Sequence, residues 1–299
     1  MRTKNLRKFL FCAVSFFCIQ TFISCDKSNS DVKEPGLSLG IESLVNLRDM
    51  GGFRTIHNQT IAYGKLYRSN QLTNISTEDM KKLTKLKLKN VFDMRNTPER
   101  NAFPEELPLG VKYNIIDVAG NTTDTAVINT LNIFNYPEFA NEKFGDGKIE
   151  ELVKMVYRQI VSKTSADSCF SILFNTICKE EELPVLFHCA TGKDRTGWVA
   201  AAFLSLMEVP EESIYENYLL SCDYIIPLYK TVTDKYLEAG GNENLIVAIL
   251  GVKREYLEAA FDEMKNRYGT IENYFSTALK IDAEKQQVLK NIFLVDLKK

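Results

Sequence analysis

A short apolar segment in the second half of the chain runs straight into a loop and then into an apolar helix. The segment is residues 183–187 (LPVLF), the loop reads HCATGKDRTG over residues 188–197, and the apolar pattern of a buried helix follows at 198–207. A buried strand, a glycine-containing loop and a buried helix in this order form a βα unit of a parallel sheet. Ligands of such sheets bind at the carboxyl ends of the strands, where this loop should lie.

The segments around this unit show both extended and helical patterns. Strands are expected near residues 65–68, 90–93 and 111–118, and helices after Ser76, around 149–161 and after Ser165. Beyond Pro210 the pattern is almost entirely helical, at 211–220, 254–268, 271–279 and 282–294. We therefore expect an α/β fold, with a central, mainly parallel sheet flanked by helices and a helical C-terminal part. Residues 41–299 are interpreted as one domain; within it, residues 119–147 show no clear pattern, and residues 119–162 are candidates for a lid over the site.

The first 24 residues are interpreted as an export signal rather than as part of the fold. Residues 2–8 are basic, and residues 9–23 form an apolar run that is short and interrupted for a transmembrane helix. Ser24-Cys25 resembles a bacterial lipobox, so we expect lipid attachment at Cys25 and a polar tether over residues 25–40. An ordinary cleaved signal is the alternative. The expected location is the bacterial cell envelope, lipid-anchored to a membrane, facing the periplasm or the outside.

Charge and residue counts exclude several classes of protein. The net charge is −2, and removal of the four basic residues within 1–24 makes it −6, a poor basis for nucleic-acid binding. The chain has two histidines and no CxxC, so a zinc site is not expected. After residue 25 the cysteines are Cys169, Cys178, Cys189 and Cys222, and a buried free thiol is the default for all but Cys189. We expect no metal and no cofactor.

The loop between Cys189 and Arg195 has the composition of a phosphate cradle. Five intervening residues let the backbone curl so that amides from Ala190 to Arg195 face one centre, and the following helix adds the positive end of its dipole. Gly192 permits a backbone conformation that other residues resist. Arg195 can grip two phosphate oxygens with its planar guanidinium. The residues expected to contact substrate are Ala190, Thr191, Gly192, Lys193 and Thr196.

The same positive surroundings favour the thiolate of Cys189, which can attack phosphorus and form a cysteinyl-phosphate that water then hydrolyses. Thr196 is the candidate hydroxyl donor to the departing thiolate. A general acid must protonate the leaving oxygen. Asp194, inside the loop, is the first choice, and Asp117, at the end of the expected strand 111–118, is the second. Lys193 is a substrate contact or a solvated lysine beside the cleft.

His188 precedes the cysteine on the expected strand, so its side chain should point away from the thiol. We therefore expect His188 to orient the loop through hydrogen bonds rather than to act as a general base. A papain-like cysteine protease is disfavoured on the same ground, and the other histidine, His57, is expected at the surface.

These residues resemble a known family. HCATGKDRTG is similar to the signature loop of protein tyrosine phosphatases and dual-specificity phosphatases, and most like a bacterial branch of secreted tyrosine/serine- and lipid-directed phosphatases. The N-terminal motif NxRDxGG of that branch is matched at 46–52, its RSxxL segment at 68–72 and its DLR…E segment at 93–99, and the resemblance covers about residues 44–295.

The resemblance implies Cys189 as nucleophile, Arg195 as phosphate binder and Asp194 as acid, with no Trp-Pro-Asp loop present. Four further motif residues are expected to brace the loop without touching substrate: Arg48, Asp49, Asp93 and Arg95. Lys193 after the loop glycine resembles phosphatases that accept phosphoinositides. The expected substrate is a phosphorylated protein or an inositide. Two alternatives are a rhodanese-like sulfurtransferase, whose loop is typically shorter, and a lipoprotein that binds phosphorylated ligands without turnover.

Overall fold

The computed structural model describes residues 34–120 and 134–297. They belong to one compact unit that begins at Glu34. The expected signal segment and Cys25 lie outside the described residues. Part of the expected tether does not: Ser38 pairs with Arg48 through an isolated bridge and donates its backbone N–H to the Tyr224 hydroxyl.

A five-stranded sheet forms the centre of the unit, in the order β1-β3-β6-β4-β5. The strands are β1 Arg48–Asp49, β3 Leu66–Ser69, β4 Asn90–Asp93, β5 Lys112–Ile115 and β6 Val185–His188. β6 lies between β3 and β4 and is parallel to both, β5 is parallel to β4, and only β1 is antiparallel. A second, two-stranded sheet joins β2 Gln59–Ile61 to β7 Leu294–Asp296. The mainly parallel sheet expected from the sequence is confirmed.

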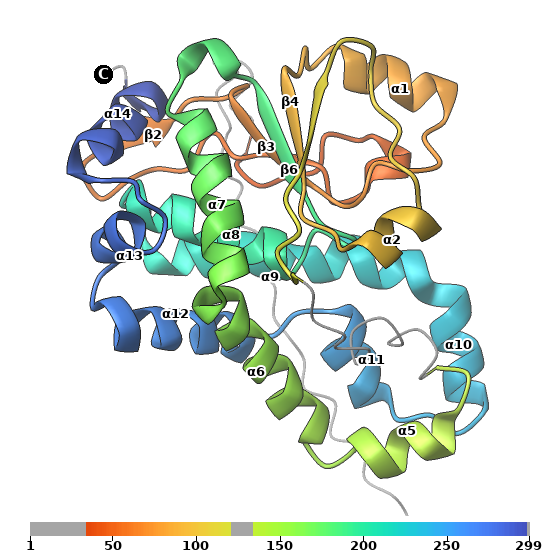
Figure 1. The fold of residues 1–299 in the computed structure, drawn as a ribbon. Helices are drawn as coiled ribbons and strands as arrows, with labels where there is room; N and C mark the ends of the chain where they lie inside the picture. Colours follow the sequence, from red (N-terminus) through yellow and green to blue (C-terminus); the bar gives the residue numbers. More distant parts are fainter. Residues whose placement is uncertain (1–33, 121–133, 298–299) are drawn as a thin grey trace, which may run out of the picture. The chain divides into compact units, whose positions relative to one another are not determined.

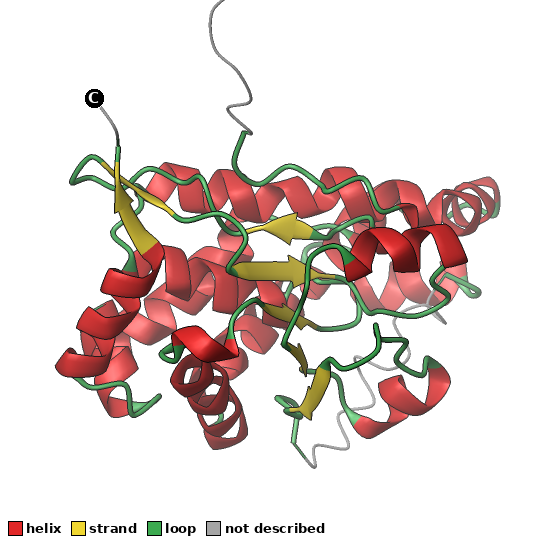
Figure 2. Cartoon of the chain, turned by 90° about the horizontal axis from the view of Figure 1, so that it is seen from above, coloured by secondary structure: helices red, strands yellow, loops and turns green. Residues whose placement is uncertain are grey.

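Helices cover both faces of the sheet (Figure 2). Before β6 the chain forms α1 Thr77–Thr84, α2 Thr97–Ala102, α5 Pro137–Phe144, α6 Lys148–Ser162 and α7 Thr164–Ile177. After β6 follow α8 Arg195–Leu206, α9 Glu211–Ile225, α10 Lys230–Glu238, α11 Glu243–Leu250, α12 Arg254–Tyr268, α13 Ile271–Thr277 and α14 Ala283–Phe293. The helical C-terminal part is thus confirmed, and Figure 1 shows where each helix lies.

Alternation along the strands explains the two-sided packing. Phe92, Val185 and Phe187 belong to the large core formed with α7, α8 and α12, whereas Val91 and Leu186 belong to a smaller core with Leu83 of α1. Successive side chains of a strand point to opposite faces, so a strand with both faces covered reads as a continuous apolar run. This is why LPVLF contains no polar residue.

A third group of apolar residues lies among α5, α6, α10 and α11. It includes Phe134, Ile149, Tyr236 and Ile246. The sequence pattern does not predict helices α5, α10 and α11, because they are only 8, 9 and 8 residues long and two of them end at a glycine. α5 falls within the stretch expected to form a lid, while residues 121–133 of that stretch lie outside the described residues.

Candidate active site

The loop after β6 connects the central strand to α8 at the carboxyl edge of the sheet. The strand ends at His188 and the helix begins at Arg195, three residues earlier than the apolar pattern suggested. Cys189 is buried with 1% of its surface exposed and is a free thiol. The sequence therefore places the thiol, the loop and the N-terminus of α8 at the edge where parallel sheets bind ligands.

Four consecutive carbonyls of the loop accept hydrogen bonds from residues outside it. The donors are His188 Nδ1 to Cys189 O (3.1 Å), Gln71 N to Ala190 O (3.0 Å), Asn46 Nδ2 to Thr191 O (2.9 Å) and Arg68 Nη2 to Gly192 O (2.8 Å). The backbone amides of residues 190–195 have no acceptor within the described part of the chain. Because the C=O of one residue and the N–H of the next point in opposite directions, these four outward carbonyls leave the amides of residues 190–193 to face the concave side, as in anion-binding nests.

Gly192 is required by both conformation and space. Its φ is +72°, and a Cβ built on it would lie 2.3 Å from Ser69 O and 2.6 Å from Ser69 C. The loop is therefore seated directly on the backbone that follows β3. The expectation that this glycine permits a special backbone conformation agrees with the geometry.

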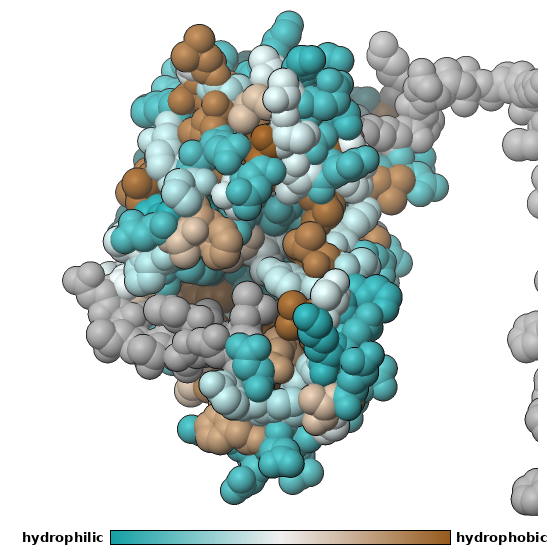
Figure 3. All heavy atoms as spheres, turned by 90° about the vertical axis from the view of Figure 1, so that its right-hand side faces the viewer, coloured by the Kyte–Doolittle hydropathy of each residue, from teal (hydrophilic) through white to brown (hydrophobic). Residues whose placement is uncertain are grey.

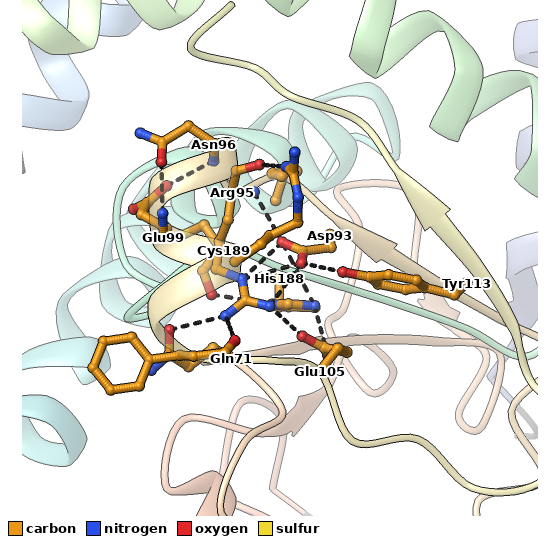
Figure 4. Close-up of polar contacts among 12 residues, drawn as sticks. Gln71, Asp93, Arg95, Asn96, Glu99, Glu105, Tyr113, His188 and Cys189 are labelled. Atoms are coloured by element: carbon orange, nitrogen blue, oxygen red, sulfur yellow. Dashed lines mark hydrogen bonds and ion pairs between the residues drawn. The ribbon is translucent and has the colours of Figure 1, made fainter.

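Arg195 is held by Glu99 at the start of α2. Arg195 Nη2 and Nη1 donate to the two carboxylate oxygens of Glu99 at 2.6 Å and 2.8 Å, and Nη1 also donates to Met94 O at 3.0 Å. Burial alone would lower the pKa of Arg195, but the charge and hydrogen bonds of Glu99 outweigh burial and raise it. Glu99 also completes the capping box of α2 with Asn96, so the helix start fixes the carboxylate (Figure 4).

His188 is fully buried and its two ring nitrogens face acceptors. Nδ1 lies 3.1 Å from Cys189 O, and Nε2 lies 3.1 Å from Glu105 Oε1. Because a carbonyl and a carboxylate accept rather than donate, this arrangement favours the imidazolium form of His188, with a hydrogen on both nitrogens. Burial alone would lower the pKa of His188, but Glu105 and Asp93 raise it above its ordinary value. The expected orienting role of His188 agrees with these contacts. Glu105, the partner of Nε2, could not be identified from the sequence.

Asp93 and Arg95 form a buried ion pair beside His188 (Figure 4). Arg95 also bonds to Glu105, and Tyr113 donates to Asp93 Oδ2 at 2.7 Å. Although Asp93, Glu105 and His188 cluster tightly enough to suggest a metal site, the Arg95 guanidinium bonds both carboxylates there. Burial alone would raise the pKa of Asp93, but its partners lower it. The network lies behind the loop, in agreement with a bracing role.

Arg48 and Asp49 sit on β1, farther from the thiol. Arg48 Nη1 donates to Asn217 O at 2.7 Å and Nη2 to Ser221 Oγ at 3.1 Å, which ties β1 to α9. Asp49 accepts from the amides of Gly51 and Gly64 at 2.8 Å and 2.9 Å. These contacts brace the fold around the loop rather than the loop itself.

Asp194 is linked to two donors through one oxygen. Tyr157 Oη and Lys193 Nζ both donate to Asp194 Oδ1, at 2.7 Å and 2.8 Å, and the Tyr218 hydroxyl donates to Tyr157 Oη at 2.6 Å. Among the described residues no hydrogen bond reaches Oδ2, so this oxygen is available to carry a proton. Lys193 is buried against Asp194, so the interpretation of a solvated lysine is wrong.

The alternative acid, Asp117, and the candidate hydroxyl donor, Thr196, lie in different surroundings. Asp117 follows β5 and accepts from the Gly120 amide at 3.0 Å, the contact of a residue that begins a turn. Thr196 is fully buried on the first turn of α8, and its hydroxyl has no partner within the described chain. A free hydroxyl on the helix next to the loop is what a donor to the Cys189 sulfur requires.

The structure shows an α/β fold with a cysteine-to-arginine loop at the carboxyl edge of its parallel strands, and comparison with known proteins identifies the family. A model of the tyrosine phosphatase family matches residues 39–295, so this chain belongs to the tyrosine phosphatase family. A Cupriavidus necator protein, named as a tyrosine-protein phosphatase, is 26% identical over 82% of this chain and 85% of its own. The triple specificity protein phosphatase PtpB of Mycobacterium tuberculosis is 23% identical over 78% of this chain and 91% of its own.

Solved structures match this chain at low similarity. The crystal structure of P. aeruginosa TpbA covers 64% of this chain and 90% of its own, with 15% identity and a TM-score of 0.28. In the described residues, no helix is long and apolar enough to cross a membrane. Figure 3 shows one face of the molecule, where hydrophilic side chains prevail and hydrophobic ones are scattered in small groups.

Proposed function

We propose that this protein hydrolyses phosphate monoesters through a cysteinyl-phosphate on Cys189. The observation that carries the proposal is the loop itself, in which six backbone amides lack acceptors among the described residues, beside a buried free thiol and a fixed guanidinium. A tetrahedral dianion supplies the acceptors that these donors lack.

The reaction takes two steps. The Cys189 thiolate attacks phosphorus, the S–P bond forms, and the bond from phosphorus to the ester oxygen breaks as an acid gives that oxygen a proton. Water then attacks phosphorus and gives a proton to the carboxylate that the acid has become, the S–P bond breaks, and the sulfur leaves as a thiolate that the Thr196 hydroxyl stabilises. The loop amides and Arg195 stabilise the charge on the transferring group in both steps.

Asp194 is the proposed general acid, with Asp117 as the alternative. Asp194 is adjacent to Arg195 and keeps Oδ2 free of hydrogen bonds, whereas Asp117 is engaged in its own turn. Tyr157 and Lys193 fix the position of Asp194 through Oδ1, which leaves the other oxygen for the leaving group.

Phosphotyrosine is the proposed substrate group, with phosphoserine, phosphothreonine and phosphoinositides as further candidates. This range of substrates follows from the family match and from the name of the relative PtpB, a triple specificity protein phosphatase. Lys193 adds a cation beside the loop, although its ammonium is engaged by Asp194 and must rotate to reach a second phosphate. We propose further that the protein is exported and held at the cell envelope through lipid on Cys25, as residues 1–25 suggest.

The test is a metal-free assay of residues 26–299 with chelator and reductant present. p-Nitrophenyl phosphate, a phosphotyrosine peptide and a phosphoinositide are compared for wild type, Cys189→Ser, Asp194→Asn and Asp117→Asn. Loss of turnover in Cys189→Ser supports the covalent mechanism. The aspartate variant that loses turnover of the phosphotyrosine peptide, while keeping more of its turnover of p-nitrophenyl phosphate with its more acidic leaving group, identifies the acid. Binding of inorganic phosphate without turnover of any substrate would favour the binding lipoprotein.

A further inference from the structure

Arg68 is a fully buried arginine next to the loop that joins β6 to α8. It lies on β3 in register with Phe187 of β6, and its Nη2 donates to Gly192 O at 2.8 Å. A longer contact of 3.5 Å joins Nη2 to Ser221 Oγ. Its Nε and Nη1 have no hydrogen-bond partner among the described residues. Unpaired buried donors of a charged group are costly, so their presence calls for a function.

Unlike two other arginines near the loop, Arg68 has no carboxylate partner among the described residues. Arg95 is paired with Asp93 and Glu105, and Arg195 with Glu99. Neither Arg68 nor the neighbouring Arg48 has a carboxylate partner within the described part of the chain. A guanidinium taken out of water without a counter-charge is among the least favourable groups that a protein can bury.

We propose that Arg68 is the buried counter-charge of the anionic site: its charge stabilises the Cys189 thiolate and the bound phosphoryl group from behind the loop, while Nη2 holds the Gly192 peptide in place. This inference rests on the proposed function, because it assigns a role within the same reaction. Arg68 is a positioning residue, since the Gly192 peptide lies between its guanidinium and the concave side of the loop.

The electrostatic surroundings of Arg68 support this assignment. Burial lowers the pKa of Arg68 to about 10, and the largest opposing influence is Cys189, followed by Tyr157 and Tyr218. Arg48, on the adjacent strand, is a second positive charge near Arg68, and burial together with the charge of Arg68 lowers its pKa. The Cys189 thiolate, or a phosphate bound in front of it, is therefore the negative charge that acts most on Arg68, while the Asp194 carboxylate of the loop is engaged by Lys193 and Tyr157.

The experiment measures thiolate formation without requiring turnover. The rate of alkylation of Cys189 by iodoacetamide is followed against pH, resolved by mass spectrometry of the Cys189 peptide, in residues 26–299. The variants are Arg68→Met and Arg68→Gln, which remove the charge, and Arg68→Lys, which keeps it. Arg48→Met is the matched control, an equally buried arginine of the adjacent strand that does not bond to the loop.

Both neutral variants at position 68 are expected to move the alkylation midpoint upward by about one pH unit or more. Protection by inorganic phosphate should weaken about tenfold, while Arg68→Lys stays near wild type and Arg48→Met shifts less. A folded neutral variant with the wild-type midpoint and phosphate affinity would overturn the proposal. So would an equal shift in Arg68→Lys and Arg68→Met, which would indicate a merely structural role.

Two further outcomes remain decisive. If neither neutral variant folds, Arg68→Lys decides: a midpoint near wild type supports the proposal, and a rise of about one pH unit with the charge retained contradicts it. If wild type turns over no phosphate ester, the proposed function fails, whereas the alkylation and phosphate-protection results still test the role of Arg68.

Discussion

Glu99 accepts a hydrogen bond from each terminal nitrogen of Arg195, at 2.6 Å and 2.8 Å, so the guanidinium is fixed before any substrate arrives. Glu99→Gln keeps a residue that can complete the capping box of α2 but removes the charge and one acceptor. We expect kcat/KM for p-nitrophenyl phosphate to fall about 100-fold through misplacement of Arg195. Steady-state kinetics measure this, with the exposed Glu212→Gln as control; equal kinetics in both variants would show that Glu99 does not position Arg195.

Gly192 and Gly110 both have positive φ, at +72° and +84°, but only Gly192 has backbone atoms where a Cβ would go. Gly110→Ala should cost about 1–2 kcal/mol of stability, the usual strain of this conformation. Gly192→Ala should cost more and should abolish phosphate binding, because the loop must lift off Ser69. Thermal unfolding with and without phosphate distinguishes the two variants. Equal losses of stability, with phosphate stabilisation retained in both, would refute the close packing at Gly192.

His188 makes the stability depend on pH with a definite sign. Its folded-state pKa is raised above the unfolded value of about 6.5, because Glu105 and Asp93 outweigh the opposing effect of burial. The stabilisation is therefore complete below about pH 6.5 and is lost as the pH rises through the folded-state pKa. Urea unfolding should show a free-energy gap between His57→Gln and His57→Gln/His188→Gln that narrows with rising pH. A gap constant from about pH 5 to pH 9 would mean that His188 is not the imidazolium inferred here.

Tyr157 and Tyr218 should respond unequally to loss of their hydroxyls. Tyr157→Phe leaves the buried Tyr218 hydroxyl without its acceptor, whereas Tyr218→Phe leaves Tyr157 still bonded to Asp194. We expect Tyr157→Phe to cost about 1–3 kcal/mol and Tyr218→Phe less. Only Tyr157→Phe should also lower kcat, because it releases Asp194. Urea unfolding and kinetics of the two single variants and the double variant give the coupling free energy between the two hydroxyls. Identical effects of the two single variants on kcat would show that Tyr157 does not position Asp194.

The elements nearest the loop were predictable because their patterns are local. The apolar run 183–187 gave β6, and the spacing from Cys189 to Arg195 gave the cradle. Glu105, Tyr157 and Gln71 could not be found in this way, since each reaches the site through a tertiary contact and stands in no distinctive local pattern. Arg68 did stand in a motif segment, at 68–72, but its burial under Gly192 depends on the pairing of β3 with β6.

The position of β6 has a consequence for how the chain folds. The strand at residues 185–188 is inserted between strands at 66–69 and 90–93, so a chain synthesised only to residue 180 cannot complete its sheet. Until β6 arrives, β3 and β4 present two unpaired apolar edges, the kind of surface that promotes aggregation. The last strand to join the sheet also leads directly into Cys189, the proposed nucleophile. Reactivity of Cys189 therefore reports complete assembly, and a truncated or unfinished chain lacks the site altogether.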